Sequence, residues 1–336
     1  MVCPTQTTCY ASLFKNAGGV GNDHSEVAAT SSVGLSGFHA VVAPSLGQPG
    51  EPGSLTCGAQ KSCLDALSTG IARTTDGAVS WTTTPTPANF SFSSVSCLGL
   101  TLCLAGGYDA DHSTVSLLRS TTFGRSWTPA TLPTLPHPAN EVVDQVACAS
   151  TTACMAHVGD NVNPAGSVLR SSDGGSTWSV VTLPSGTQLD ALSCSGISAP
   201  SQCVAGLRSS TRMYFARTAD LGSTWHVTAV GPAAGTALAP FPMAVGCFKT
   251  LCLLGGQRVG SSTVGLLYRS VNGGSSFTRV AVPAGATRVS AIAFSSAKVA
   301  LVGIQLGIEP TTASLMRTTD AGAHFATESF PPGLIS

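Results

Sequence analysis

Short hydrophobic runs recur along this chain in a fixed order, and turn residues separate them. A run ending in Cys, such as SSVSC at 93–97, is followed by a turn and a second run beginning at the next Cys, such as CLAGG at 103–107. A third run, such as VSLLRS at 115–120, ends in Arg-Ser, and a fourth, such as WTPATLP at 127–133, stops at Pro. Short apolar runs bounded by turn residues predict β-strands, so the pattern predicts four strands per repeat.

A nine-residue segment between the third and fourth run repeats through the chain, and we call each copy a box. Six copies run from Arg to Trp or Phe, and a seventh has lost the Arg and the Asp but keeps the closing aromatic residue. Repeats of about 40–50 residues with four strands each are typical of propeller blades. The sequence therefore predicts one all-β domain over residues 1–336, a seven-bladed β-propeller of four-stranded antiparallel blades. The boxes occupy 30–38, 73–81, 119–127, 170–178, 217–225, 269–277 and 317–325.

Each box has the composition of a tight turn. An Asp or Asn such as Asp173 can accept hydrogen bonds from backbone N–H groups of its own turn. Gly175, Gly222, Gly274 and Gly322 supply a position where a positive φ is cheap. A calcium loop needs several carboxylates per turn, and each box has one, so we interpret the boxes as structural.

The twelve cysteines fall into six local pairs, which predicts one hairpin disulfide in each of blades 1 to 6. Zinc sites use tighter Cys-x-x-Cys knuckles or interleaved His, and this chain has neither. Disulfides form in oxidising compartments, so we expect an extracellular or cell-surface protein. The last blade has Ala293-Phe294 and Val299-Ala300 in place of cysteines. The predicted pairs are Cys3 with Cys9, Cys57 with Cys63, Cys97 with Cys103, Cys148 with Cys154, Cys194 with Cys203, and Cys247 with Cys252.

The two ends of the sequence lead to two further expectations. Met1-Val2-Cys3 leaves no room for a signal peptide, so we expect a mature or excised form, or export by a leader outside this sequence. The first blade lacks most of its inner strand, and we expect Leu334 to Ser336 to supply it, because sheet closure removes exposed edges.

Composition and charge exclude several classes of function. Only 10% of residues are charged, and the 16 basic residues equal the 16 acidic ones. Without a basic stripe, the chain lacks the electrostatic footprint of a nucleic-acid-binding protein. The apolar runs are too short to span a bilayer. We predict no cofactor and expect a monomer.

The box pattern Ser/Thr-x-Asp-x-Gly-x-Thr-Trp resembles the Asp box, or BNR repeat, of sialidases and sortilin-type receptors. It also resembles the repeats of the photosystem II assembly factor of the Ycf48 type and of xyloglucan-cleaving glycosidases. The Cys-x5-Cys pairs followed by Ala-Gly look like repeats of secreted actinobacterial proteins. The resemblance covers nearly the whole chain and implies the propeller fold, but these families share the box and not an activity.

A true sialidase activity is not expected. The resemblance to sialidases would require an Arg triad, a Tyr–Glu nucleophile pair and an acid/base Asp. Six of the twelve arginines begin boxes, which lie on the face opposite the usual ligand site. Tyr10 and Tyr268 lie beside a cysteine turn or a box, and neither Tyr108 nor Tyr214 has an obvious Glu partner.

Loops between the second and third strands share one face of a propeller with the connections between blades, and we place a candidate site there. The connections offer Glu51, His137 and Glu141. The candidate ligand-binding residues are His24, Tyr108, His112, His157, Asn161, Arg208, Arg212, Arg258 and Glu309, and the candidate catalytic carboxylates are Asp23, Glu26, Asp109, Asp111 and Asp160.

Two interpretations of these residues remain open. In the first, the chain is a non-catalytic propeller that binds a glycan or protein partner through its loop face. In the second, Asp23 or Glu26 and a carboxylate from another blade act as acid and base in a glycoside hydrolase or polysaccharide lyase. The cluster from Asp109 to His112 could also hold a metal ion, but sequence cannot supply ligands from other blades. All four Trp residues lie in boxes, where they cannot stack on sugars, which favours the binding interpretation.

Overall fold

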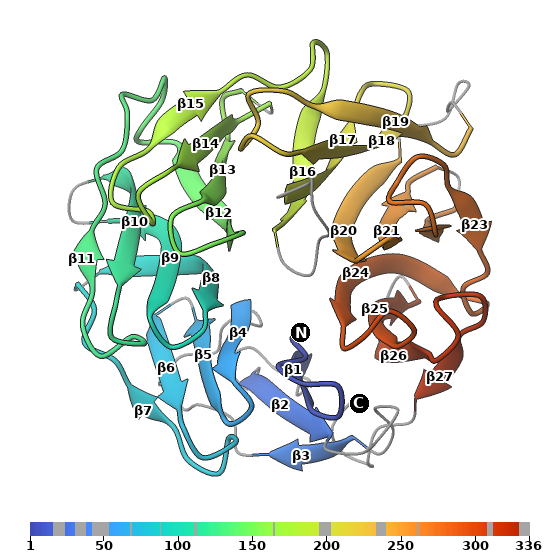
Figure 1. Ribbon diagram of the computed structural model, residues 1–336, viewed down its shortest axis with the longest axis horizontal. Helices are drawn as coiled ribbons and strands as arrows, with labels where there is room; N and C mark the ends of the chain where they lie inside the picture. The colour runs from blue at the N-terminus through green and yellow to red at the C-terminus, as the bar shows by residue number, and fades with distance from the viewer. Residues whose placement is uncertain are drawn as a thin grey trace. The chain divides into compact units, whose positions relative to one another are not determined.

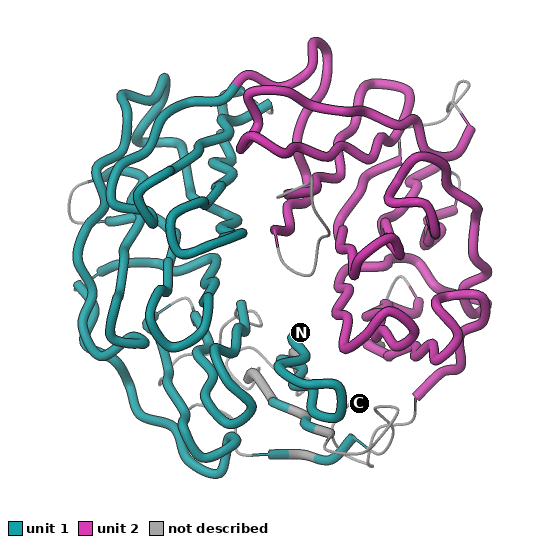
Figure 2. Tube along the Cα trace, viewed as in Figure 1, with its two compact units in different colours: residues 1–31, 38–181, 331–336 teal, residues 32–37, 182–330 magenta. Residues whose placement is uncertain are grey.

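The structure is a computed structural model. It describes residues 1–15, 24–30, 38–41, 54–67, 69–87, 89–110, 113–163, 165–194, 203–232, 240–260, 262–307 and 312–328. Every regular element in these ranges is a β-strand (Figure 1). The chain divides into two compact units (Figure 2): residues 1–31, 38–181 and 331–336 form unit 1, and residues 32–37 and 182–330 form unit 2. The single domain expected over residues 1–336 therefore stays a prediction.

Unit 1 contains one three-stranded and three four-stranded antiparallel sheets, each with its strands in chain order. The first strands of successive four-stranded sheets lie against one another, β4 with β8 and β8 with β12. The strands are β1 (Cys9–Lys15), β2 (His24–Thr30), β3 (His39–Val41), β4 (Ser54–Ala59), β5 (Ser62–Leu67), β6 (Gly70–Thr74), β7 (Thr82–Thr83), β8 (Phe90–Leu98), β9 (Leu102–Asp109), β10 (Thr114–Ser120), β11 (Thr128–Pro129), β12 (Glu141–Cys148), β13 (Cys154–Asp160), β14 (Ser167–Ser171) and β15 (Ser179–Val181).

Unit 2 contains three four-stranded antiparallel sheets of the same design. Their first strands also lie against one another in sequence, β16 with β20 and β20 with β24. The strands are β16 (Gln188–Ser193), β17 (Cys203–Arg208), β18 (Met213–Thr218), β19 (His226–Val230), β20 (Phe241–Phe248), β21 (Leu251–Arg258), β22 (Val264–Ser270), β23 (Thr278–Val280), β24 (Ala286–Phe294), β25 (Ala300–Leu306), β26 (Thr312–Thr318) and β27 (Ala326–Glu328).

The prediction of seven four-stranded blades is wrong, because the described residues form six four-stranded sheets. Residues 1–41 form a sheet with only three described strands. Before β1, where little of an inner strand was expected, the described residues form only an isolated bridge between Val2 and Tyr10. The box at 30–38 and the tail from Leu334 to Ser336 lie largely or wholly outside the described residues.

All six predicted disulfides are present, and no cysteine is free. One belongs to the three-stranded sheet, and five close the first hairpin of a four-stranded sheet. The two cysteines of a pair stand directly opposite each other in four of these ladders, with Cα atoms 3.9 Å to 4.1 Å apart. The sheet from β24 to β27 has no disulfide, as its sequence predicts. The bonds join Cys3 to Cys9, Cys57 to Cys63, Cys97 to Cys103, Cys148 to Cys154, Cys194 to Cys203, and Cys247 to Cys252.

The box forms the predicted turn between the third and fourth strand. The Ser171 hydroxyl accepts a hydrogen bond from the Gly175 N–H at 2.8 Å, and Asp173 Oδ1 accepts from the N–H groups of Ser176 and Thr177, both at 3.0 Å. Gly175 has φ +84°, the left-handed conformation expected for it. These hydrogen bonds hold the pKa of Asp173 at about 2, so the box carries an ionised carboxylate down to low pH.

Four of the six arginines that begin boxes have a role that the sequence did not reveal. Arg119 Nε donates a 2.8 Å hydrogen bond to the Gly174 carbonyl oxygen in the box of the next sheet. Arg73 contacts the Phe123 carbonyl oxygen in the same way at 3.0 Å. Unit 2 repeats the contact from Arg217 and from Arg269. The box arginines therefore fasten neighbouring blades within each unit.

Each unit is stabilised by apolar side chains packed between its sheets. In unit 1, Leu104 and Leu117 of one sheet pack with Val143 and Leu169 of the next, and all four are fully buried. The fourth strands are shorter than predicted: of the run at 127–133, only Thr128–Pro129 form a strand beside β10, and Thr131 makes an isolated bridge to Thr177 in the next box. No helix long and apolar enough to cross a membrane occurs among the described residues.

Candidate functional site

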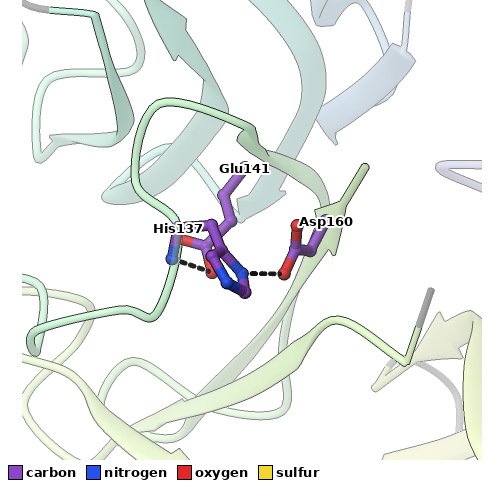
Figure 3. A group of neighbouring side chains, drawn as sticks. All are labelled: His137, Glu141 and Asp160. Atoms are coloured by element: carbon purple, nitrogen blue, oxygen red, sulfur yellow. Dashed lines mark hydrogen bonds and ion pairs between the residues drawn. The ribbon is translucent and has the colours of Figure 1, made fainter. Parts of the chain in front are cut away.

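A cluster of three side chains lies at one end of the sheet formed by β12 to β15 (Figure 3). His137 belongs to the connection before β12, Glu141 begins β12, and Asp160 ends β13. Glu141 and Asp160 are opposite each other in the first pair of the β12–β13 ladder. Their ligand atoms and that of His137 all lie within 4.8 Å of one another, and Figure 3 shows the three side chains pointing toward one another.

Hydrogen bonds fix two of these three side chains. His137 Nδ1 is 2.7 Å from Asp160 Oδ2, and the Val162 N–H donates to Asp160 Oδ1 at 2.8 Å. The His137 N–H reaches Glu141 Oε1 at 3.5 Å, a long contact. Glu141 is fully buried, and its Oε2 has no hydrogen-bond partner in the described part of the chain.

The pKa values of the two carboxyl groups in the cluster are shifted in opposite directions. Burial raises the pKa of Glu141, and the negative charge of Asp160 adds to the effect. Burial also acts to raise the pKa of Asp160, but hydrogen bonds from the His137 side chain and from backbone N–H groups outweigh it and lower that pKa. The cluster therefore holds one carboxyl group with a lowered pKa and one with a raised pKa.

The same sheet carries a second acid–imidazole pair. His157 on β13 is buried, and its Nδ1 lies 2.8 Å from Asp144 Oδ1. Asp144 lies at a bulge in β12, between Val143 and Gln145, which changes the direction of its side chain. His157 Nε2 has no hydrogen-bond partner among the described residues. Asp144 thus orients the ring, and the other nitrogen remains available.

The first sheet of unit 2 has a comparable pair. Asp190 lies at a bulge in β16, and Arg208 Nε on β17 donates to its Oδ1 at 3.0 Å. The Arg208 guanidinium also lies over the Phe241 ring, 4.5 Å from its centroid. Asp144 and Asp190 both stand four residues before the first cysteine of their hairpin, a signal that sequence reasoning could have used but missed.

Unit 2 also contains a cavity of about 250 Å³. Arg258, at the end of β21, and Arg279, on β23, line it together with the Tyr268 and Phe277 rings. Tyr268 is buried, and both arginines are exposed. Two guanidinium groups beside aromatic rings suit an anionic ligand with an apolar part. The remaining lining residues are Gly231, Pro232, Pro240 and Leu266.

The structure brings together some of the predicted site residues and not others. Asp160 lies beside His137 and Glu141, as expected for a second-to-third-strand loop and a connection between blades at the same end of a sheet. Tyr108 and Asp109 are half-buried at the end of β9, Asn161 is exposed, and Arg212 lies in the turn before β18. His24 and Glu26 lie on β2, but their side chains are outside the described residues, as are Asp23, Asp111, His112 and Glu309. Sequence reasoning missed Arg279, Asp144 and Asp190.

Comparisons with known proteins identify the fold. No family model matches the chain, and no curated protein matches it. The solved structure of Ycf48 bound to D1 peptide is 12% identical with a TM-score of 0.60, and covers 92% of this chain and 96% of its own. Ycf48 from Cyanidioschyzon merolae is 17% identical with a TM-score of 0.54, covering 80% and 81%. An ulvan lyase of polysaccharide lyase family PL25 is 9% identical with a TM-score of 0.55, covering 83% and 84%.

At these identities the likeness shows the fold alone, and the chain has the fold of a β-propeller protein. The proteins that share this fold include a peptide-bound protein and a lyase, so the fold is compatible with either binding or catalysis.

Proposed function

We propose that the chain is an extracellular, non-catalytic binding propeller of the Asp-box type, and that it recognises a protein partner through an acidic residue or a carboxyl terminus. The single observation that supports this ligand is the unit 2 cavity, where Arg258 and Arg279 lie beside two aromatic rings. The six disulfides support an extracellular location, since such bonds persist in oxidising compartments.

The arginines of this cavity differ from most others in the chain. In the described part, eight arginine side chains donate hydrogen bonds, to backbone carbonyl oxygens or to neighbouring side chains. Arg258 and Arg279 make no such bond to the described residues and share one cavity instead. Guanidinium groups bind carboxylates through bidentate hydrogen bonds, so the two arginines together offer an anion-binding site.

The size and lining of the cavity favour a peptide over a sugar chain. A cavity of about 250 Å³ is smaller than the roughly 300–1,000 Å³ of most small-molecule pockets, so it holds one side chain or one chain terminus. Pro232, Pro240 and Leu266 give it an apolar wall. Apart from the two arginines and Tyr268, no described lining side chain carries a group that could bind sugar hydroxyls. We therefore favour an acidic residue next to an apolar one.

The described carboxylates also favour binding over hydrolysis. A general acid needs a raised pKa and access to the substrate. Hydrogen bonds lower the pKa of Asp160, and the two described carboxyl groups with raised pKa values, Glu141 and Asp65, are fully buried. Asp144 and Asp190 are engaged by His157 and Arg208. Ycf48, which shares the fold, has been solved with a bound peptide, as the name of that structure states.

The experiment is a peptide array probed with the full, disulfide-intact chain, followed by titration of the tightest peptide. We expect acidic peptides with an adjacent apolar residue to bind, and Arg258→Gln and Arg279→Gln each to weaken binding about tenfold, the effect of losing about 1.4 kcal/mol. Arg125→Gln is the matched control, because Arg125 is also exposed and donates no side-chain hydrogen bond to the described residues.

Three results would contradict the proposal. These are an array with no acidic binder, equal affinity of the two cavity variants and the wild type, and hydrolysis or elimination products when the chain is incubated with polysaccharides. If an acidic polysaccharide binds and no peptide does, the ligand is a glycan and the proposed protein partner is wrong.

A further inference from the structure

We propose that His137, Glu141 and Asp160 form a binding site for one divalent transition-metal ion, with Zn²⁺ the preferred ion. This site lies within unit 1 and is independent of the unit 2 cavity.

The first argument is the placement of two carboxyl groups with like charge. Glu141 and Asp160 are direct partners in an antiparallel ladder, a position where like charges destabilise the sheet. The Asp160 side chain is 2% exposed, and Glu141 is fully buried, so water does little to screen their repulsion. A dication between the two carboxylates would remove this repulsion. Without one, the His137 side chain interacts with Asp160 alone, through a hydrogen bond of 2.7 Å.

The second argument is the unpartnered Oε2 atom of Glu141. A buried carboxylate oxygen without a hydrogen bond is costly, and native proteins rarely leave one in that state. This atom is buried and without a partner among the described residues, and its carboxyl group points toward the other two side chains (Figure 3). A bound cation would satisfy it.

The third argument is that the backbone holds the imidazole in place. The Asn140 N–H donates to the His137 carbonyl oxygen at 2.7 Å, which closes the turn before β12. The Val115 N–H donates to the Pro138 carbonyl oxygen at 3.1 Å, which ties this turn to β10. The His137 side chain is 38% exposed and therefore forms the entry from solvent.

The donor set selects the class of ion. One imidazole nitrogen and two carboxylate oxygens suit Zn²⁺ better than Ca²⁺ or Mg²⁺, which take oxygen ligands. Zinc ligands lie about 2.0–2.2 Å from the ion, so neighbouring ligands are about 3–3.5 Å apart. The 2.7 Å distance from His137 Nδ1 to Asp160 Oδ2 must open slightly, and the longest separation, within 4.8 Å, must close by side-chain rotation. Three protein ligands leave a fourth position open to water or a ligand group.

The test is calorimetric titration of the full, disulfide-intact chain with Zn²⁺ alone. All twelve cysteines are in disulfides, so no thiolate competes for the ion. We expect one Zn²⁺ per chain, no competition from excess Ca²⁺, and weakening of at least about 100-fold in His137→Ala, since loss of an outer-shell partner alone weakens metal sites about 10–100-fold. Co²⁺ substitution should give visible absorption bands that disappear in the same variant.

Two further variants and one control complete the test. Asp160→Asn keeps the oxygen that accepts from the Val162 N–H, so it should fold and bind weakly even if Glu141→Gln does not fold. The control is His324→Ala, because His324 Nδ1 lies 2.6 Å from Asp320 Oδ2 in an exposed pair without a third ligand. The proposal is overturned if the wild type does not bind Zn²⁺ saturably. It is equally overturned if His137→Ala and Asp160→Asn bind like the wild type, or if His324→Ala abolishes binding.

Discussion

The conformation of the box glycine leads to a sharp prediction about stability. Gly175 has φ +84°, and a Cβ atom added to it would lie 2.4 Å from Cδ2 of Leu104, which is fully buried. An alanine there is strained by about 1–2 kcal/mol in the left-handed region. The contact with Leu104 adds overpacking of about 1–3 kcal/mol. Alanine also lowers the conformational entropy of the unfolded chain, which stabilises the folded state by about 0.4–1 kcal/mol. We expect Gly175→Ala to destabilise the protein by about 1–5 kcal/mol, the sum of these magnitudes.

A second variant separates the two causes. In a Leu104→Ala background the steric contact disappears, so Gly175→Ala should then be destabilising by only about 1 kcal/mol, the residual backbone strain. Guanidinium unfolding of the disulfide-intact chain, followed by tryptophan fluorescence, measures the free energy of unfolding of all four proteins. An equal effect of Gly175→Ala in both backgrounds would refute the steric part of the argument.

An equivalent position supplies the control. Ala78 occupies the place of Gly175 in the box at 73–81, with φ +66° and a buried methyl group. Ala78→Gly relieves about 1–2 kcal/mol of backbone strain. The loss of a buried methyl group and the larger conformational entropy of the unfolded chain both oppose this gain. We therefore expect a change within about 1 kcal/mol of zero, the residual of these magnitudes. A large loss of stability in this variant would show that the left-handed strain is overestimated.

Three further predictions follow from single contacts. Arg119→Ala should destabilise by about 1–3 kcal/mol in the same unfolding assay, because it removes a charged hydrogen bond to the Gly174 carbonyl oxygen. Asp76 and Asp173 have pKa values of about 2, below the 3.8 of the unfolded chain, so their contribution is complete above pH 4 and is lost as the pH falls toward 2. The urea midpoint of the double variant with Asp76→Asn and Asp173→Asn should therefore change less between pH 4 and pH 2 than that of the wild type. An equal change in the two proteins would contradict this. Burial raises the pKa of Asp65 to about 6, so its contribution is complete below pH 3.8 and is lost as the pH rises through 6. In urea unfolding, the free energy of unfolding of Asp65→Asn relative to the wild type should be higher at pH 8 than at pH 4 by as much as about 3 kcal/mol. A lower relative stability at pH 8 would contradict this.

Local patterns in the sequence were sufficient to predict the repeating parts of the fold. Strand order within a blade, the turn in the six described boxes and all six disulfides depend on residues close together in the chain, and all are confirmed. The count of seven four-stranded blades was wrong because it relied on residues 334–336 to complete the first blade, and residues 1–41 contribute only three described strands and the Val2–Tyr10 bridge. The fourth strand at 127–133 was predicted too long, since pairing with β10 ends at Thr128–Pro129.

Contacts between segments far apart in the chain were harder to predict. Arg119 and Gly174 are 55 residues apart, so the link between blades leaves no local signature in the sequence. The bulge that places Asp144 beside His157 depends on how two strands pair, which hydrophobic periodicity does not specify. By contrast, the shared end of a sheet was sufficient to bring Asp160 and His137 into one candidate region before the structure was known.

The affinity of the chain for its tightest acidic peptide tests the central claim most directly. It is measured by titration for the wild type, the double variant with Arg258→Gln and Arg279→Gln, and the control Arg125→Gln. The account predicts a loss of at least about tenfold in the double variant, because two arginines that bind one carboxylate are coupled and their losses need not add, and no change in the control. Equal affinity of the double variant and the wild type would contradict it.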